Sequence, residues 1–405
     1  MLSKILETQK IILEDFQATP FFARDCFADF HLDNQITGLM GSRGIGKTTF
    51  LLHAAIQADA LSGNAVYLSA DSFHLSTGGL LALADQLYKE TDCRMLCIDE
   101  IHKYPNWQQE LKNIADTYRQ FKILFTSSSM IDIVSSAYDL SRRVTLHHLY
   151  GLSFREYLAF YHDIHCPRIT LDELLTSHIS IANALKVPQL LKHFHHYFSF
   201  GYYPFFKIFT HNFGKTQAIE NATQKTIYED IATLHNLRTP TLLVIEKLFQ
   251  YITHSLPGEM SVSKLASHLG KDFDSVSTYL DYLEKSGLIH CLYPMQSGKA
   301  RLRNPLKMYP ENSNLIYTSI RAEKDDAVIG KVRETFAINQ LHNAGHAVFY
   351  SKVGDIQIKE AIFEIGGRNK TDKQIKGVYN AYVLADGILS GNKNIIPLFL
   401  LGLLG

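Results

Sequence analysis

The 405-residue sequence predicts an α/β fold of the P-loop NTPase class, followed by helical and mixed units. Two observations predict it. Between residues 36 and 150, short apolar runs alternate with segments of helical length, as in a parallel sheet with crossover helices. Residues 41–48 read GSRGIGKT, which matches the phosphate-binding pattern GxxxxGK[ST] in full. The match follows one apolar run and begins a helical segment, which is where such a loop belongs.

The composition is that of a globular protein without a net charge. Lys and Arg together number 40, as do Asp and Glu, and 46% of the residues are hydrophobic. Balanced charge gives no long-range attraction to nucleic acid or membrane, so a polyanionic partner must be bound by a local patch. The five cysteines form no CxxC pair, which is typical of free thiols in a reducing compartment.

Neither end of the sequence predicts a membrane segment. Residues 1–17 read as an amphipathic helix without the uninterrupted apolar run of a signal peptide. The apolar run at 395–405 is too short to cross a bilayer of about 30 Å as a helix, and we expect it to be a buried terminal strand. We therefore expect a cytoplasmic protein with no membrane partner.

Four segments follow one another along the chain. Residues 1–150 carry the alternating pattern and form the predicted P-loop core. Residues 151–238 are rich in aromatic residues and His at helical spacing, which predicts a helical lid. Residues 239–295 read as helices joined by a Gly-containing turn and followed by a strand, as in a winged helix-turn-helix. Residues 296–405 predict a mixed α/β unit.

The loop at 41–49 predicts a site for ATP. Glycines let the backbone wrap closely around phosphates, and the helix that follows adds the partial positive charge of its N-terminus. Lys47 would reach the β- and γ-phosphates, and the Thr48 hydroxyl would bind Mg²⁺. The predicted nucleotide-binding residues are Gly41, Ser42, Arg43, Gly44, Ile45, Gly46, Lys47, Thr48 and Thr49.

An acidic pair ends the apolar run MLCIDE at residues 95–100. A carboxylate at the mouth of a buried strand is costly unless a cation meets it, so we expect Asp99 to hold Mg²⁺. Glu100, one residue on, would orient and polarise the attacking water as general base. The alternative for both residues is a structural role in capping the next segment.

Two further candidates come from the next strands. The run KILFTSSS ends in hydroxyl residues, of which Thr126 or Ser127 would contact the γ-phosphate, unless they only cap the next helix. Arg142 and Arg143 precede a strand-like run, and an arginine against the γ-phosphate stabilises transition-state charge, in its own subunit or in a neighbour's. The alternative is a solvated or paired arginine. No guanine-specific segment is present, so ATP is the expected nucleotide.

With these motifs placed, the chain resembles a large prokaryotic family of AAA-like ATPases. The resemblance is carried by GSRGIGKTT, CIDEIHKYPNWQQELKNIAD, SRRVTLHHLYGLSFREYL, GYYPFF, and FEIGGRNKT with NIIPLFLLGLL. Members join a P-loop domain to a winged helix and a C-terminal restriction-endonuclease-like domain. The resemblance implies ATP binding and hydrolysis, and places the family's arginine on Arg143. Arg142 stands where the family usually has Gly.

The endonuclease resemblance implies two acids and a lysine around Mg²⁺, the last two on alternate residues of one strand. The candidate acids are Glu334, Asp355 and Glu364. Gly366 stands where that lysine would follow Glu364, and the nearest lysine downstream is Lys370. We therefore do not expect nuclease activity, because metal catalysis needs its ligands and its cation placed together.

Other charged and histidine-rich segments give weaker signals. The presumed recognition helix is net acidic, which disfavours a DNA groove and favours a protein contact. A basic segment that follows it could grip phosphates or be a solvated face. The histidines at 162–166 and 193–196 lack a matching second ligand pair for zinc. The acids of the helix are Asp272, Asp274, Asp281 and Glu284, its cations Lys271 and Lys285, and the basic segment holds Lys299, Arg301, Arg303 and Lys307.

Together these predictions describe an ATP- and Mg²⁺-dependent ATPase that acts as a conformational switch on a protein partner or on copies of itself. Two other functions remain open at this stage. One is an ATP-driven protein that binds or processes DNA. The other is an interaction module that binds ATP without turning it over.

Overall fold

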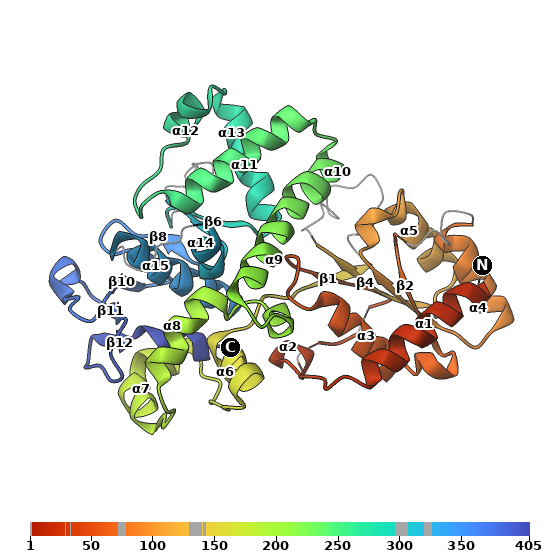
Figure 1. Cartoon of the computed structure of the whole chain (residues 1–405), viewed down its shortest axis with the longest axis horizontal. Helices are drawn as coiled ribbons and strands as arrows, with labels where there is room; N and C mark the ends of the chain where they lie inside the picture. The colour runs from red at the N-terminus through yellow and green to blue at the C-terminus, as the bar shows by residue number, and fades with distance from the viewer. Residues whose placement is uncertain are drawn as a thin grey trace. The chain divides into compact units, whose positions relative to one another are not determined.

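The computed structural model divides the chain into two compact units, residues 1–150 and 151–405. Figure 1 labels most of their helices and strands, which are numbered in chain order. The structure describes residues 2–28, 30–32, 34–71, 78–128, 140, 143–295, 307–319 and 326–405.

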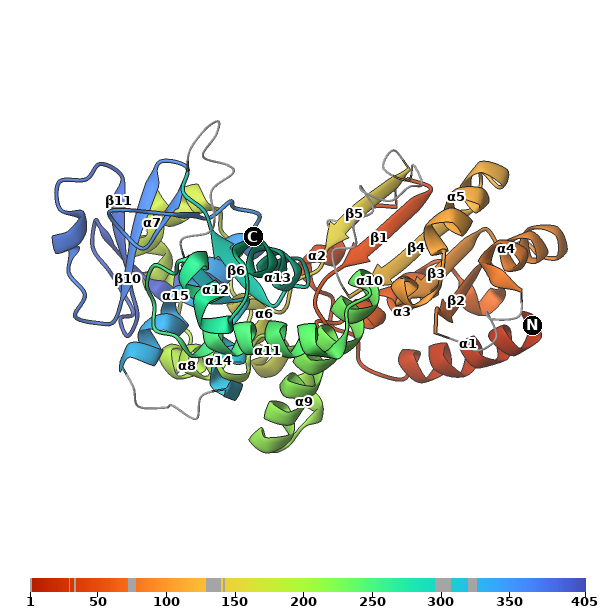
Figure 2. The same cartoon turned by 90° about the horizontal axis from the view of Figure 1, so that it is seen from above.

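Unit 1 is built on a five-stranded sheet in which every neighbouring pair is parallel, as the alternating sequence predicts. Figure 2 shows the strands side by side in the order β2-β3-β4-β1-β5. Since all strands run the same way, their carboxyl ends share one edge. The strands are β1 (Ile36–Met40), β2 (Ala65–Ser69), β3 (Met95–Asp99), β4 (Lys122–Ser127) and β5 (Val144–His148).

Among the described residues of unit 1, side chains of α1, α4 and α5 join those of the sheet in one apolar core. The first is the amphipathic helix predicted at the start of the sequence, whose buried Gln9 accepts a hydrogen bond from the backbone N–H of Tyr67 at 2.7 Å. Trp107, the only tryptophan of the sequence, is buried at the start of α5, with its ring 5.6 Å from that of Phe125. The helices are α1 (Leu2–Gln17), α2 (Asp25–Ala28), α3 (Lys47–Gln57), η1 (Ala60–Ser62), α4 (Gly79–Glu90), η3 (Ile101–Lys103) and α5 (Trp107–Thr117).

Unit 2 begins with helices. Ser153 and Thr170 each cap a helix through a hydrogen bond to the third helical residue, Glu156 and Glu173, which bonds back. The helices are α6 (Phe154–His162), α7 (Leu171–Ala184), α8 (Leu190–Phe200), η4 (Pro204–Ile208), α9 (Asn212–Lys225), η5 (Thr226–Ile231), α10 (Ala232–His235), α11 (Thr239–His254), α12 (Val262–Leu269), α13 (Phe273–Lys285), α14 (Ser313–Ser319) and α15 (Asp326–Asn343). Among the described residues, no helix is long and apolar enough to cross a bilayer.

Two sheets complete unit 2. Strands β6 (Ile289–Leu292) and β7 (Lys307–Pro310) pair antiparallel. A mixed five-stranded sheet has the order β12-β11-β10-β9-β8, in which β10, β11 and β12 are parallel. Its strands are β8 (Phe349–Tyr350), β9 (Ile356–Ile358), β10 (Ala361–Gly366), β11 (Ala381–Ala385) and β12 (Ile395–Pro397).

The end of the sequence differs from the predicted terminal strand. Only Ile395–Pro397 pairs in the sheet, and Leu398–Leu403 forms the 3-10 helix η8. Proline has no N–H to continue a ladder, which explains why pairing stops at Pro397. The apolar side chains of η8 are buried, so the run is part of the core in a different conformation.

A buried carboxyl group joins distant segments of unit 2. The Glu311 carboxylate accepts hydrogen bonds from the Tyr202 hydroxyl and from the side-chain amides of Asn312, at 2.6 Å, and Asn339, at 3.1 Å. Burial raises the pKa of Glu311 to about 7, and the hydrogen bonds offset only part of this rise. The network fixes the turn at Tyr202 against helix α15.

Unit 2 is expected to lose stability as the pH rises from 4.5, the ordinary pKa of Glu311, to about 7. In this window the folded state keeps a proton that the unfolded chain releases, and a shift of this size corresponds to about 3 kcal/mol. The urea midpoint of unfolding is measured at about pH 5 and about pH 8. It should depend less on pH in Glu311→Gln than in the wild type. The exposed Glu360→Gln is the control. Equal pH dependence in all three proteins would contradict the expectation.

Candidate functional site

The predicted phosphate loop connects the carboxyl end of β1 to the first residue of α3, Lys47. Gly46 is the N-cap with φ of +102°, a conformation that L-residues other than glycine rarely adopt. The Lys47 ammonium group donates to the carbonyl oxygens of Gly41, at 2.7 Å, and Ser42, at 2.9 Å. A buried ammonium group therefore lies inside the loop, where phosphate oxygens would be its natural partners.

The acid at the end of β3 lies directly beside this loop. Asp99 Oδ2 accepts a hydrogen bond of 2.8 Å from the hydroxyl of Thr48, and Asp99 Oδ1 accepts one from the hydroxyl of Thr126. The Tyr67 hydroxyl lies 3.4 Å from the same carboxylate, and burial together with the Asp99 charge raises the pKa of Tyr67. The two predicted Mg²⁺ ligands, Thr48 and Asp99, are thus in contact.

Glu100 takes a left-handed conformation, with φ of +51°, immediately after β3. Such a conformation is uncommon for a residue with a side chain and is typical of constrained positions at functional sites. Its backbone N–H donates to Thr126 Oγ1 at 2.9 Å, and its carboxylate pairs with Lys103 at 2.5 Å. Lys103 also pairs with Asp71 at 3.1 Å. Glu100 is therefore held at the carboxyl edge of the sheet.

The pKa of Glu100 is lowered from its ordinary value. Burial alone would raise the pKa, but the hydrogen bond and charge of Lys103 outweigh burial, with a further contribution from the charge of Arg43. The carboxyl group is therefore ionised at neutral pH, as a general base must be.

Ser127 ends β4 at the same edge and is fully buried. Its hydroxyl lies 3.1 Å from Nδ1 of His102, and the hydroxyl of Ser128 lies 3.1 Å from Nε2 of the same ring. His102 thus links β4 to the turn that carries Glu100. Thr126, the other predicted γ-phosphate contact, is bound instead to Asp99 and to the backbone of Glu100.

Arg143 is not brought together with these residues. It directly precedes β5, whose first residue, Val144, pairs with Ile36 at the beginning of β1. Because the strands are parallel and rise about 3.3 Å per residue, Arg143 lies about 15 Å from the edge that carries the phosphate loop. Its guanidinium group forms an ion pair with Asp116 of α5. Arg142 lies outside the described residues.

Sequence reasoning missed several residues around the acidic pair, among them Tyr67, His102 and Lys103. His102 and Lys103 stand two and three residues after Glu100, so their spacing alone could have marked them as neighbours. Tyr67 reaches Asp99 only because β2 pairs with β3, which the order of the strands decides.

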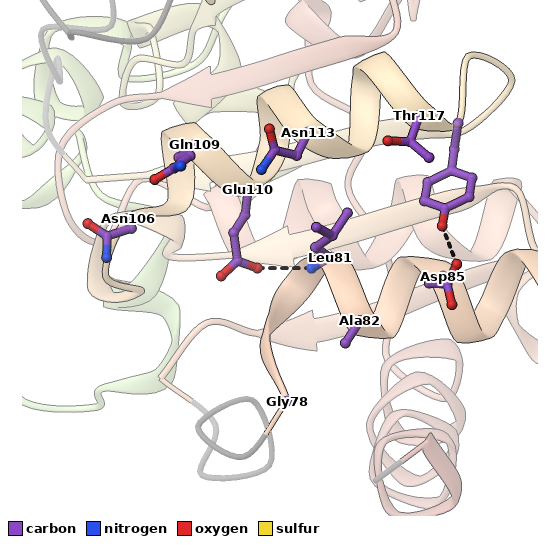
Figure 3. Close-up of a pocket in the computed structure, with 10 residues that line it drawn as sticks. Gly78, Leu81, Ala82, Asp85, Asn106, Gln109, Glu110, Asn113 and Thr117 are labelled. Carbon is purple, nitrogen blue, oxygen red and sulfur yellow. Dashed lines mark hydrogen bonds between the residues drawn. The ribbon is translucent and has the colours of Figure 1, made fainter.

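A separate hollow of about 650 Å³ lies between α4 and α5, as Figure 3 shows. Its carboxylates bind within the protein: Glu110 accepts from the backbone N–H of Leu81 at 2.9 Å and from the Tyr104 hydroxyl at 2.8 Å, and Asp85 accepts from the Tyr118 hydroxyl. The described residues that line it carry carboxylates and no cation, so the hollow does not suit a phosphate. None of the phosphate-loop residues lines it.

In unit 2 the three acids weighed for nuclease chemistry lie near two lysines. Lys307 lies 3.3 Å from Asp355 and 3.9 Å from Glu334, and Lys370 pairs with Glu364. Burial, and then the charge of Asp355, raise the pKa of Glu334 to about 7. The lysine absent two positions after Glu364 is thus replaced by one six positions on.

The carboxylates of this cluster are bound by lysines in the structure, and the described ranges contain no group of three or more His, Cys, Asp or Glu side chains arranged to hold a metal. Nor is Lys307 part of an exposed phosphate-binding patch, as the sequence suggested, because its ammonium group is largely buried in these ion pairs. Lys299, Arg301 and Arg303 lie outside the described residues.

The presumed recognition helix α13 is less uniformly acidic at its surface than its sequence suggests. Glu284 turns toward β6 and accepts a hydrogen bond of 3.1 Å from the backbone N–H of Cys291. Asp272 is the N-cap of the helix and accepts from the backbone N–H of Ser275 at 2.8 Å. Asp274 and Asp281 remain as exposed acids, against the paired Lys285 and the exposed Lys271.

Two family models match parts of the chain. Residues 33–158 match a family model described as an AAA domain, and residues 191–325 match a domain of unknown function. No curated protein matches the sequence. Together with the parallel sheet and the phosphate loop, the first match makes residues 33–158 an AAA-like P-loop NTPase domain.

Two of the solved structures that match show a distant similarity. AMPPCP-bound DnaA from Aquifex aeolicus is 17% identical with a TM-score of 0.30, covering 67% of this chain and 90% of that one. PCH-2 from C. elegans is 18% identical with a TM-score of 0.23, covering 39% of this chain and 44% of that one. Scores of this size do not establish a shared function.

Proposed function

We propose that unit 1 binds ATP together with Mg²⁺ and hydrolyses it. The observation that carries the proposal is the convergence of Lys47, Thr48 and Asp99, with the Lys47 ammonium group inside the phosphate loop and Thr48 hydrogen-bonded to Asp99. These are the charges and hydroxyl that a nucleoside triphosphate and a divalent cation need. The predicted general base, Glu100, lies one residue beyond Asp99.

Each of these residues would have a separate role in such a site. Bound Mg²⁺ would neutralise charge on the β- and γ-phosphates, and Thr48 and Asp99 are the residues that would hold it. The backbone of residues 41–46 and the Lys47 ammonium group would bind the phosphates. Glu100 would take a proton from the attacking water, and Ser127, held by His102, would contact the γ-phosphate.

We assign Arg143 a role in a neighbouring copy of the chain. At the amino edge of its own sheet it is too far from its own phosphate loop, so it would reach the γ-phosphate of a second subunit. The ion pair with Asp116 keeps the guanidinium group in place beside α5. Self-association through this edge would then be needed for hydrolysis.

We expect Arg143→Ala to lower ATP turnover at least about tenfold without changing nucleotide affinity, since such arginines stabilise transition-state charge. Mixing this variant with Glu100→Gln should restore part of the activity, because mixed assemblies contain sites with both residues intact. Steady-state phosphate release measures both effects.

Asp116→Asn is the matched control for this experiment, because it removes the ion pair and keeps the arginine. It should retain most of the turnover. If the mixture of Arg143→Ala and Glu100→Gln stays as inactive as its components, the arginine does not act between subunits.

For unit 2 we propose a helical lid over 151–238, a winged helix over 239–295 and a restriction-endonuclease-like α/β part without nuclease activity over 296–405. Nucleotide binding would act through these parts as a conformational switch toward a protein partner, in the cytoplasm. The exposed Asp274 and Asp281 on α13 support a protein surface over a DNA groove.

Steady-state ATP hydrolysis with Mg²⁺, measured with and without double-stranded DNA, tests this function. Turnover that is indifferent to DNA is expected of a protein-directed switch. Turnover stimulated several-fold by DNA would favour a DNA-processing protein, and tight binding without turnover would favour a module that only binds ATP.

A further inference from the structure

The segment between β10 and β11, residues 367–380, has an unusual concentration of cations. Residues 367–376 contain four basic residues and one acid, Asp372, in a sequence whose total charges balance. Arg368, Lys373 and Lys376 are exposed to solvent. Asp372 is the one acidic residue in their part of the sequence. The basic residues are Arg368, Lys370, Lys373 and Lys376.

This segment is a crossover between parallel strands. It leaves the carboxyl end of β10 at Gly366 and enters β11 at Ala381, which pairs with Ile362 near the start of β10. The segment therefore runs back over about the length of a strand, roughly 15 Å, and its basic residues follow one another along it from Arg368 to Lys376. Basic residues distributed along such a segment suit a series of phosphates better than a single phosphate.

Two buried carboxylates, Glu364 and Asp386, hold one of these cations, Lys370, and one cation from outside the segment, Arg333. Glu364 is 2% exposed and pairs with Lys370. Asp386, 3% exposed, accepts from Arg333 Nε at 2.8 Å and lies 2.9 Å from Nε2 of His195. A buried carboxylate needs such partners, so Lys370 and Arg333 are held in place before any ligand arrives.

Gly366 and Gly367 leave the space that the Lys370 and Arg333 side chains occupy. A Cβ atom on Gly366 would lie 2.6 Å from Cγ of Lys370, and one on Gly367 would lie 3.2 Å from the guanidinium group of Arg333. Side chains at these positions would displace the two cations. The Gly-Gly pair thus lets Lys370 and Arg333 lie across the backbone of the loop.

An exposed aromatic residue lies at the other end of the crossover. Tyr379 is 88% exposed, three residues after Lys376 and two before β11. An exposed tyrosine ring offers a surface on which an unpaired base can stack, and proteins that bind single strands combine such rings with basic grooves. The bases of a duplex are already stacked on one another, so they would not stack on this ring.

We propose that residues 367–380 bind single-stranded nucleic acid, with the cations on the phosphodiester backbone and Tyr379 stacked on a base. The proposal is independent of ATP hydrolysis by unit 1. It concerns different residues from the basic segment at 299–307. Because the contacts are to phosphates and to the face of a base, the site has little sequence preference.

Fluorescence anisotropy of the full chain with labelled oligo-dT and oligo-U of about 20 nucleotides tests the proposal over a range of salt concentrations. The triple variant Arg368→Gln, Lys373→Gln, Lys376→Gln should bind at least about tenfold more weakly and lower the slope of log K against log salt by about two. Tyr379→Ala should weaken binding about fivefold or more while leaving the slope unchanged, and Tyr379→Phe should bind normally.

The matched control removes three exposed lysines elsewhere in unit 2: Lys186→Gln, Lys192→Gln, Lys225→Gln. It should bind as the wild type does. Equal loss in the control and in the test variant, no binding by the wild type, or preference for duplex DNA or polyglutamate over the single strands would each overturn the proposal. Circular dichroism melts establish that all variants fold. The DNA and RNA probes show which nucleic acid is preferred.

Discussion

Lys47→Ala is expected to reduce ATP affinity at least about 100-fold, since charge-assisted hydrogen bonds to phosphate oxygens contribute about 1.5–3 kcal/mol each. The Lys47 ammonium group lies inside the phosphate loop, where it donates to the carbonyl oxygens of Gly41 and Ser42. Titration with a fluorescent ATP analogue, with and without Mg²⁺, measures the effect.

The outcome also decides the proposed function as a whole. Lys89→Ala is the matched control, because it removes a lysine that is exposed and paired with Asp85 in the same unit. It should bind ATP as the wild type does. Unchanged affinity in Lys47→Ala would mean that the loop at 41–48 is not the nucleotide site, and the ATPase proposal would fall with it.

Glu100→Gln is expected to lower the rate of hydrolysis at least about 100-fold while changing ATP affinity less than about threefold, because only the transition state needs the base. Glutamine has the same shape and still offers an oxygen to Lys103, so the turn should keep its geometry. Single-turnover phosphate release separates the chemical step from binding.

Two other variants sharpen this test. Glu90→Gln removes an exposed carboxylate of α4 and should hydrolyse ATP normally. Lys103→Met leaves the Glu100 carboxylate without its ion-pair partner and should alter turnover more than affinity. If Glu100→Gln hydrolysed ATP at the wild-type rate, the base would have to be another group, and Glu100 would be a structural residue with a strained backbone.

Much of unit 1 can be predicted from the sequence because its signals are local. The phosphate pattern occupies eight consecutive residues, and each strand of the parallel sheet is a short apolar run that can be read by itself. The juxtaposition of Thr48 and Asp99 follows from the same logic, since strand ends meet at one edge of a parallel sheet. The family-model match to an AAA domain confirms the class of fold.

Other features depend on contacts between distant segments. Arg143 was placed before a strand, but its distance from the phosphate loop follows from the direction and pairing of β5. The Tyr202–Glu311 hydrogen bond joins residues 109 positions apart, and no local sequence pattern predicts it. Strands β9 and β11 give little local signal, because β9 has three residues and both lie among turns. The winged-helix and endonuclease-like parts remain predictions.

Lys370 shows that the partner of a buried carboxylate can also be missed when only the local sequence pattern is considered. A motif read along one strand looks for the cation two positions after Glu364 and finds glycine. Lys370, six positions after Glu364, nevertheless pairs with that carboxylate, because Gly366 leaves room for the lysine side chain. A spacing rule describes one backbone path, and a different path can bring the same charges together.

Trp107 gives the protein an optical property that follows from its position. It is the only tryptophan of the sequence, so the indole emission of the whole chain comes from one place. That place is the start of α5, directly after the turn that carries Glu100, His102 and Lys103, with the ring packed on Phe125 beside Thr126. Any rearrangement of this turn changes the surroundings of a single chromophore. The unlabelled chain therefore carries its own fluorescence reporter for rearrangements of the turn that holds Glu100.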